Sequence, residues 1–116
     1  MKALKRLTRG HDTVLAPELL YAECASVLAA GVRRNRWSGA AADASYALLM
    51  QLPVHPVSDR RHLERAWELS RRYDNHPVYD MLYVATAEAS GTVLITADET
   101  LLQRMGHLSW VRRPGT

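Results

Sequence analysis

The sequence predicts an α/β protein with a mainly parallel sheet. The segment Thr92–Thr96 (TVLIT) is a continuous run of β-branched and aliphatic residues, which is typical of a strand buried on both faces. The segment Val78–Ser90 is apolar around most of its circumference, as expected for a helix that packs on both sides. Strand-like and helix-like segments alternate along the chain, and this alternation favours a parallel sheet flanked by helices.

The N-terminal third is predicted to form a short helix, a strand and a longer helix. Residues Met1–Arg9 carry two leucines on one side and are expected to form a helix that Gly10 ends. A β-branched run, Thr13–Leu15, then reads as a strand. It leads into a helix over Glu18–Val32 whose first turn contains Pro17, a position that suits proline.

The middle of the chain is predicted to hold two amphipathic helices joined by an edge strand. Ser38 is expected to cap the first helix, which runs to about Gln51, and Ser58 to cap the second, which ends before Tyr73. Two prolines confine Leu52–Val57 to the edge of a sheet. The side chains expected to face the core are Tyr46, Leu49 and Met50 in the first helix and Leu63, Ala66, Trp67 and Ser70 in the second.

After the strand Thr92–Thr96, a short helix over Glu99–Met105 and a last strand over Ser109–Arg112 complete the predicted order, with Gly91 ending the preceding helix. A chain of 116 residues is shorter than the length at which proteins usually divide into more than one domain. Residues 1–116 are therefore expected to form a single domain.

Composition restricts the function only loosely. The net charge of +3 and several arginine runs permit nucleic acid as a partner, although arginines at helix ends often only complement the helix dipole. The single cysteine, Cys24, cannot form an intramolecular disulfide and is expected to be a small buried residue. No segment has the apolar length of a membrane span or of a signal peptide, so we expect a cytoplasmic protein that does not bind membranes.

Three acidic residues stand where the pattern asks for apolar ones. Glu23 lies on the inward stripe of its predicted helix, and Asp80 lies near the start of the most apolar helix. Asp98 directly follows the strand TVLIT, and the carboxyl ends of strands are where open α/β sheets bind ligands. A buried carboxylate without a partner is costly, so these residues are expected to be paired, protonated or bound to a metal.

Each acid also has a structural interpretation. Glu23 could pair with an arginine, and Asp80 could interact with the dipole of its helix. Asp98 could be a turn or cap residue, and the segment from Thr96 to Glu99 fits a capping box. Taken singly, each acid is closer to a structural than to a catalytic role.

Taken together, three stretches resemble PIN-domain proteins of the VapC type in order and spacing. They are APELLYAECASVL (16–28), HPVYDMLYVATAEASG (76–91) and VLITADETLL (93–102). The segment LPVHPVS (52–58) resembles the third strand of that family, so the resemblance covers nearly the whole chain.

The resemblance implies a PIN-like three-layer fold and a metal-dependent endoribonuclease, the toxin of a toxin–antitoxin pair. Such proteins are usually homodimers that a small antitoxin protein inhibits. Glu23, Asp80 and Asp98 match the acidic catalytic and metal-binding positions, and Thr96 matches the polar residue that supports them. Carboxylate oxygens suit Mg²⁺ or Mn²⁺, which would assist hydrolysis of RNA phosphodiester bonds.

The basic run Arg33, Arg34 and Arg36 is the weakly preferred RNA contact, with a solvated helix end as the equal alternative. Single-stranded or looped RNA is the expected substrate, because its bases and backbone are accessible.

One part of the family's pattern has no counterpart in this sequence. The family opens with a central strand that ends in an aspartate, whereas this sequence starts within what resembles the following helix, and Asp12 lies in a later turn. The domain is therefore expected to be N-terminally incomplete. The strand Thr92–Thr96 and the strand Thr13–Leu15 would then expose unpaired edges toward each other.

Two other classes of function remain open. The chain could be an inactive PIN-like protein that only binds an antitoxin or RNA, or a basic helical DNA-binding regulator. The second is disfavoured because TVLITAD reads as a buried strand end and not as a recognition helix. Histidine spacing typical of zinc sites, a nucleophile elbow and glycine-rich phosphate loops are all missing from the sequence.

Overall fold

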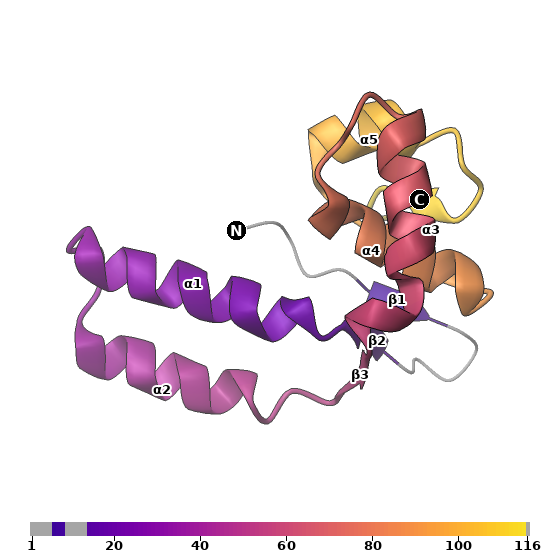
Figure 1. Ribbon diagram of the computed structural model, residues 1–116. Coiled ribbons are helices and arrows are strands. Elements are labelled where there is room, and N and C mark those ends of the chain that lie inside the picture. The colour runs from indigo at the N-terminus through magenta and orange to yellow at the C-terminus, as the bar shows by residue number, and fades with distance from the viewer. Residues whose placement is uncertain (1–5, 9–13, 116) are drawn as a thin grey trace. The chain divides into compact units, whose positions relative to one another are not determined.

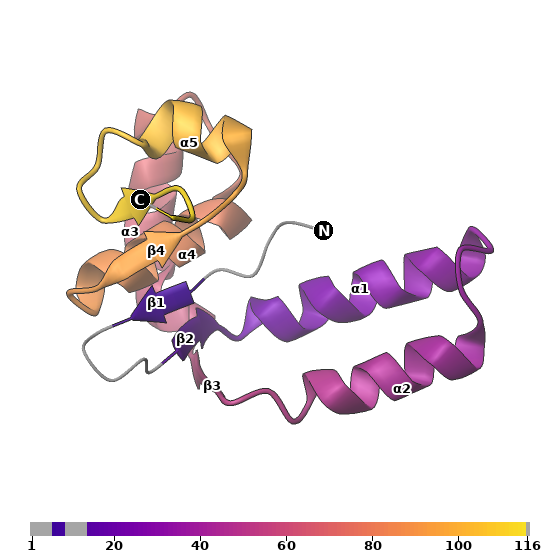
Figure 2. The same ribbon diagram turned by 180° about the vertical axis from the view of Figure 1, so that it is seen from behind.

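The computed structural model describes residues 6–8 and 14–115 and has the predicted mixed α/β architecture (Figures 1 and 2). Its helices are α1 (Leu19–Arg33), α2 (Gly39–Leu49), α3 (Asp59–Arg72), α4 (Val78–Ala89) and α5 (Glu99–Met105). Its strands are β1 (Arg6–Thr8), β2 (Val14–Pro17), β3 (Val54–Val57), β4 (Val93–Ile95) and β5 (Val111–Arg112). The chain divides into two compact units, a hairpin unit (residues 18–53) and a sheet unit (the described residues of 2–17 and 54–116).

The hairpin unit consists of α1 and α2, which lie side by side and are joined by a tight basic connection (Figure 1). The indole Nε1–H of Trp37 donates to the backbone oxygen of Leu28 at 2.9 Å, which holds the connection against α1. Ser38 caps α2 as predicted, because its hydroxyl oxygen accepts from the backbone N–H of Ala41 at 3.0 Å.

The close approach of Trp37 requires a glycine on α1. A Cβ atom added to Gly31 would lie 1.9 Å from the Trp37 ring, whereas one added to Gly39 would meet nothing within 4 Å. We expect Gly31→Ala to lower the free energy of unfolding by about 1–3 kcal/mol, because the ring must move. Gly39→Ala, the matched control, should leave stability unchanged or raise it by up to about 1 kcal/mol, because alanine favours the helix.

Urea unfolding followed by tryptophan fluorescence measures both variants. Equal effects of Gly31→Ala and Gly39→Ala would show that Trp37 does not pack on α1 in solution.

The expected inward face of α2 is only partly correct. Leu49 is buried, but the side chains of Tyr46 and Met50 are about half exposed. The hydrophobic periodicity predicts the helix correctly, yet within the hairpin unit α1 covers only part of the apolar circumference of α2.

In the sheet unit, β4 is a central strand with a neighbour on each side (Figure 2). It pairs in parallel with β5, as the run TVLIT predicted, and antiparallel with β1. A separate parallel pair is formed by β2 and β3. The described pairing leaves β3 at an edge, with Pro56 opposite Ala16, and this confirms the interpretation drawn from its prolines.

The prediction of a helix over residues 1–9 is wrong for Arg6–Thr8, which form β1; the rest of that segment and Gly10 and Asp12 lie outside the described residues. Thr8 pairs with Val93 and Arg6 with Ile95, and β1 also lies beside β2 in both views (Figures 1 and 2). The expected open edge of β4 is therefore occupied. An isolated short helix is marginal in water, whereas backbone groups at a sheet edge gain hydrogen bonds from any strand that pairs there.

Two local predictions at helix starts need correction. Pro17 belongs to β2 and not to the first turn of α1, which begins at Leu19. Ser58 occupies the N-cap position of α3, but its side chain makes no capping hydrogen bond. Proline has no backbone N–H, so it is tolerated in a strand where the residue at that position need not donate a hydrogen bond to the neighbouring strand.

The buried face of α3 differs from the predicted one. Ala66 and Ser70 are buried as expected, and Leu69 is buried beside them, but Leu63 and Trp67 are 46% and 58% exposed. α3 packs on α4, and the small side chain of Ala66 allows a close approach there. Leu63 and Trp67 therefore remain on its outer side.

Helix α4 forms the centre of the sheet unit, where it packs against α3, β2 and β4. Every residue from Asp80 to Ala87 is buried, which confirms the prediction of a helix covered on several sides. Gly91 adopts a left-handed φ of 63° directly after the helix, and Thr92 N–H then donates to the Ala87 carbonyl at 3.1 Å. This turn aims the chain into β4.

A bidentate ion pair joins α3 to α4. Arg65 Nε and Nη2 donate to the two carboxylate oxygens of Glu88 at 2.7 and 2.9 Å. The hydrogen bonds from Arg65 hold the pKa of Glu88 below its usual value.

None of the helices in the described part of the chain combines the length and the apolar character needed to cross a membrane. The single cysteine, Cys24, is a free thiol on α1 that is partly and not fully buried. Its burial, and then the charge of Glu23, raise the pKa of the Cys24 thiol. A thiol of this kind is a poor nucleophile at neutral pH.

Candidate functional site

Asp80 is a buried carboxylate in the first turn of α4 and is 3% exposed. The apolar residues Met81, Tyr83 and Val84 surround it along the same helix and are almost fully buried. Its Oδ2 atom lies 2.7 Å from Nε2 of His76. The expected burial of this carboxylate is therefore confirmed, and His76 is a hydrogen-bond partner for it.

His76 is a site residue that the sequence patterns do not reveal, because its spacing is not that of a zinc-binding histidine. Its ring is 3% exposed, and its Nδ1 atom lies 3.0 Å from an Nη1 nitrogen of Arg104 on α5. The signal that could have found it is its position four residues before Asp80, a spacing that brings two side chains together at a helix start.

Asp98 lies immediately beyond β4 and caps α5. Its Oδ1 atom accepts from Leu101 N–H at 3.1 Å, and its own N–H donates to Oγ1 of Thr96 at 3.1 Å. Thr96 is fully buried and Asp98 is partly exposed. The cap interpretation is thus correct, with Asp98 and not Thr96 as the capping residue.

The neighbour of Asp98 has a different role. Glu99 forms an exposed bidentate pair with Arg113. The hydrogen bonds from Arg113 hold the pKa of Glu99 below its usual value. Glu99 is therefore engaged at the surface by a cation of the same unit.

Glu23 belongs to α1 of the hairpin unit, while Asp80, Asp98 and Thr96 belong to the sheet unit. Its side chain is partly exposed, so the expected inward position on α1 holds only in part. Within each unit, the described residues contain no group of three or more His, Cys, Asp and Glu side chains that could hold a metal ion. The sheet unit thus contributes two of the three predicted acids.

The three arginines proposed to contact RNA are exposed at the turn of the hairpin unit. Arg33 lies in the last turn of α1 and Arg34 at its C-cap, where a cation complements the partial negative charge of the helix end. Arg36 follows the left-handed residue Asn35, whose φ is 57°. These positions are compatible with both interpretations of the basic run.

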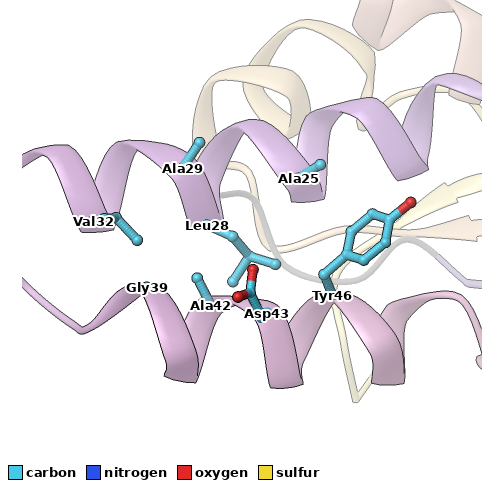
Figure 3. Close-up of a pocket in the computed structure, with 8 residues that line it drawn as sticks. All are labelled: Ala25, Leu28, Ala29, Val32, Gly39, Ala42, Asp43 and Tyr46. Atoms are coloured by element: carbon cyan, nitrogen blue, oxygen red, sulfur yellow. The ribbon is translucent and has the colours of Figure 1, made fainter.

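A shallow groove of about 400 Å³ runs between α1 and α2 (Figure 3). Leu28 and Asp43 point toward each other from the facing helices in this view. Much of the lining is small or apolar, and it consists of Ala25, Leu28, Ala29, Val32, Gly39, Ala42, Asp43 and Tyr46.

The comparisons with known proteins identify one family. The family model described as the PIN domain matches residues 1–108. The search of curated proteins gives no match to the chain. PIN domains are generally nucleases, and PIN nucleases generally use divalent metal ions. Because the family model covers most of the sequence, the chain belongs to the PIN-domain family.

Proposed function

We propose that this PIN-domain chain is a metal-dependent endoribonuclease and the toxin of a VapC-type toxin–antitoxin pair. One observation carries the proposal: Asp80 is an acid buried among apolar residues of α4, in the same unit as Asp98 at the carboxyl end of β4. Burying a carboxylate costs several kcal/mol even after the protein has relaxed, and beside the hydrogen bond with His76 a second compensating role fits this position. In a nuclease family, metal binding is that role.

The donor chemistry of these residues fits a hard divalent cation. Asp80 and Asp98 offer carboxylate oxygens, which Mg²⁺ and Mn²⁺ prefer, and Mg²⁺ often uses only one or two protein carboxylates together with water and phosphate. Hydrogen bonds with His76 and Leu101 help to hold the carboxylates of Asp80 and Asp98 respectively, and a carboxylate has several acceptor positions. Glu23 is the third ligand in this proposal.

The chain's own residues would hold and orient the site. When bound, the ion supplies an activated water and offsets the charge that develops on the phosphodiester. Thr96 and the first turn of α5 fix the backbone and the side chain of Asp98 through two hydrogen bonds. Arg33, Arg34 and Arg36 would attract the RNA backbone.

A small antitoxin protein and a second copy of the chain are the proposed protein partners. The groove between α1 and α2 supports an apolar contact, because small residues line it and the side chain of Tyr46 beside it is half exposed. Such grooves typically accept the apolar face of a helix.

Cleavage of RNA by the purified chain, with and without Mg²⁺, tests the proposed function. We expect cleavage of single-stranded or looped RNA in Mg²⁺ or Mn²⁺, loss of cleavage in EDTA, and recovery when excess Mg²⁺ is restored. Far-UV circular dichroism in EDTA is the control, because the fold should survive metal removal. Equal cleavage with and without EDTA would rule out a metal-dependent mechanism.

A binding role without chemistry is the second candidate. It is favoured by the structural bonds that both acids make, since Asp80 pairs with His76 and Asp98 caps α5. Under this alternative the chain would bind RNA or an antitoxin, and removal of the acids' charges would leave its effects unchanged.

A further inference from the structure

Three polar side chains in contact lead from the partly exposed Arg104 on α5, through the buried His76, to the buried Asp80. Arg104 Nη1 lies 3.0 Å from His76 Nδ1, and His76 Nε2 lies 2.7 Å from Asp80 Oδ2. The side chains of His76 and Asp80 are 3% and 5% exposed, while that of Arg104 is 38% exposed. The imidazole ring therefore separates the carboxylate from the arginine.

The contact with Arg104 determines which ring nitrogen carries the proton. A guanidinium nitrogen can only donate hydrogen bonds, so His76 Nδ1 must accept and cannot be protonated. The proton of the neutral ring is then on Nε2, and Nε2–H donates to Asp80 Oδ2. Arg104 thus selects the tautomer that presents a donor to the carboxylate.

The backbone around His76 is fixed independently of its ring. Ser70, buried on α3, donates its hydroxyl hydrogen to the His76 carbonyl oxygen at 2.6 Å. Asp74 and Asn75 precede it with left-handed φ values of 60° and 55°, which turns the chain sharply after α3. The His76 N–H donates to the Tyr73 carbonyl at 3.2 Å within this turn.

We propose that His76 and Arg104 are positioning residues for Asp80: His76 holds the carboxylate in one orientation, and Arg104 holds His76 in the donating tautomer. The inference rests on the proposed function, in which Asp80 binds the metal ion. It adds two residues that act through Asp80. A histidine ring without a full positive charge orients the acid and does not cancel the attraction of the carboxylate for a cation.

The first test reads the proton position directly. A two-bond ¹H–¹⁵N spectrum of the ¹⁵N-labelled full chain should show the His76 ring protonated on Nε2 alone. In Arg104→Met the Nδ1 atom loses its donor, so a population protonated on Nδ1 should appear. Arg71→Met is the matched control, because Arg71 donates to Asn75 Oδ1 in the adjoining loop at 2.9 Å.

The second test separates positioning from folding. In His76→Gln the amide nitrogen can reach the place of Nε2 and still donate to Asp80, whereas the shorter side chain in His76→Asn reaches only the place of Nδ1. Mn²⁺ affinity, measured by calorimetry, should fall about 10-fold or more in His76→Asn and stay within about 3-fold in His76→Gln, as for other residues that orient metal ligands. Both variants lose the imidazole ring, so a purely structural role predicts equal effects on unfolding and no difference in affinity.

Three results would overturn the proposal: a wild-type ring protonated on Nδ1, an unchanged tautomer in Arg104→Met, or equal Mn²⁺ affinity in His76→Asn and His76→Gln. If His76→Asn does not fold, Arg104→Met decides by its own Mn²⁺ affinity, because Arg104 is partly exposed and its replacement leaves the core intact. A wild-type chain that binds no Mn²⁺ and cuts no RNA contradicts the proposed function. The tautomer spectra then still decide whether Arg104 and His76 hold Asp80 as described.

Discussion

Replacing Asp80 by asparagine is expected to lower Mg²⁺-dependent RNA cleavage by about 100-fold or more, beyond what loss of an orienting residue costs. The asparagine oxygen can still accept from His76 Nε2, so the buried hydrogen bond survives. The negative charge is lost, and with it the attraction for a divalent cation, while one carboxylate oxygen is replaced by an amide NH2 group. Initial cleavage rates and urea unfolding of the same preparation measure the two effects separately.

The matched control for this charge removal is Glu64→Gln, because Glu64 is an exposed acid on the outer side of α3. It should cleave at the wild-type rate. Asp98→Asn extends the comparison, since asparagine caps helices about as well as aspartate and α5 should remain intact. Wild-type cleavage by Asp80→Asn and Asp98→Asn would contradict a catalytic role for both acids and leave the binding role.

The largest effect on stability is expected from Leu94→Ala in β4. Leu94 is fully buried, and its strand β4 has a neighbouring strand on each side. Truncation of such a side chain costs about 2–5 kcal/mol, because burial is lost and a cavity remains. The midpoint of urea unfolding should fall accordingly. A loss below about 1 kcal/mol would mean that this core position collapses or is open to solvent.

Leu63→Ala is the matched control, with the same chemical change in the same unit. Leu63 is 46% exposed on the outer side of α3, so its truncation should cost well under about 1 kcal/mol. The sequence pattern alone predicts the opposite, because it places Leu63 inward. The pair therefore tests the corrected face of α3 as well as the core.

Signals that act within a few residues predicted the structure well. The Ser38 cap, the turn at Gly91, the extent of α5 and the burial of Asp80 all follow from local chemistry and helical spacing. The errors on the helix faces have a different cause, because a distant partner decides which face is buried. Periodicity shows that α2 and α3 have apolar faces, but it cannot show which side meets another helix, and so Tyr46 and Trp67 were misplaced.

The candidate site shows the same division. Its acids could be proposed from the sequence, because an acidic residue within an apolar segment can be recognised without knowing the fold. Arg104 could not be linked to Asp80, because α5 and the start of α4 meet at His76 only through the fold of the sheet unit. His76 itself was within reach of helical spacing, but a histidine acting as a hydrogen-bond donor has no fixed motif.

The antiparallel pairing of β1 with β4 also bears on how the protein is made. A ribosome synthesises β1 well before β4, and contacts between such distant segments form slowly because a long loop must close first. Helices α3 and α4 are adjacent in the chain and can pack before that. The strand β1 therefore has no partner in β4 until β4 has been synthesised, which places this pairing after the packing of α3 on α4 in the nascent chain's folding.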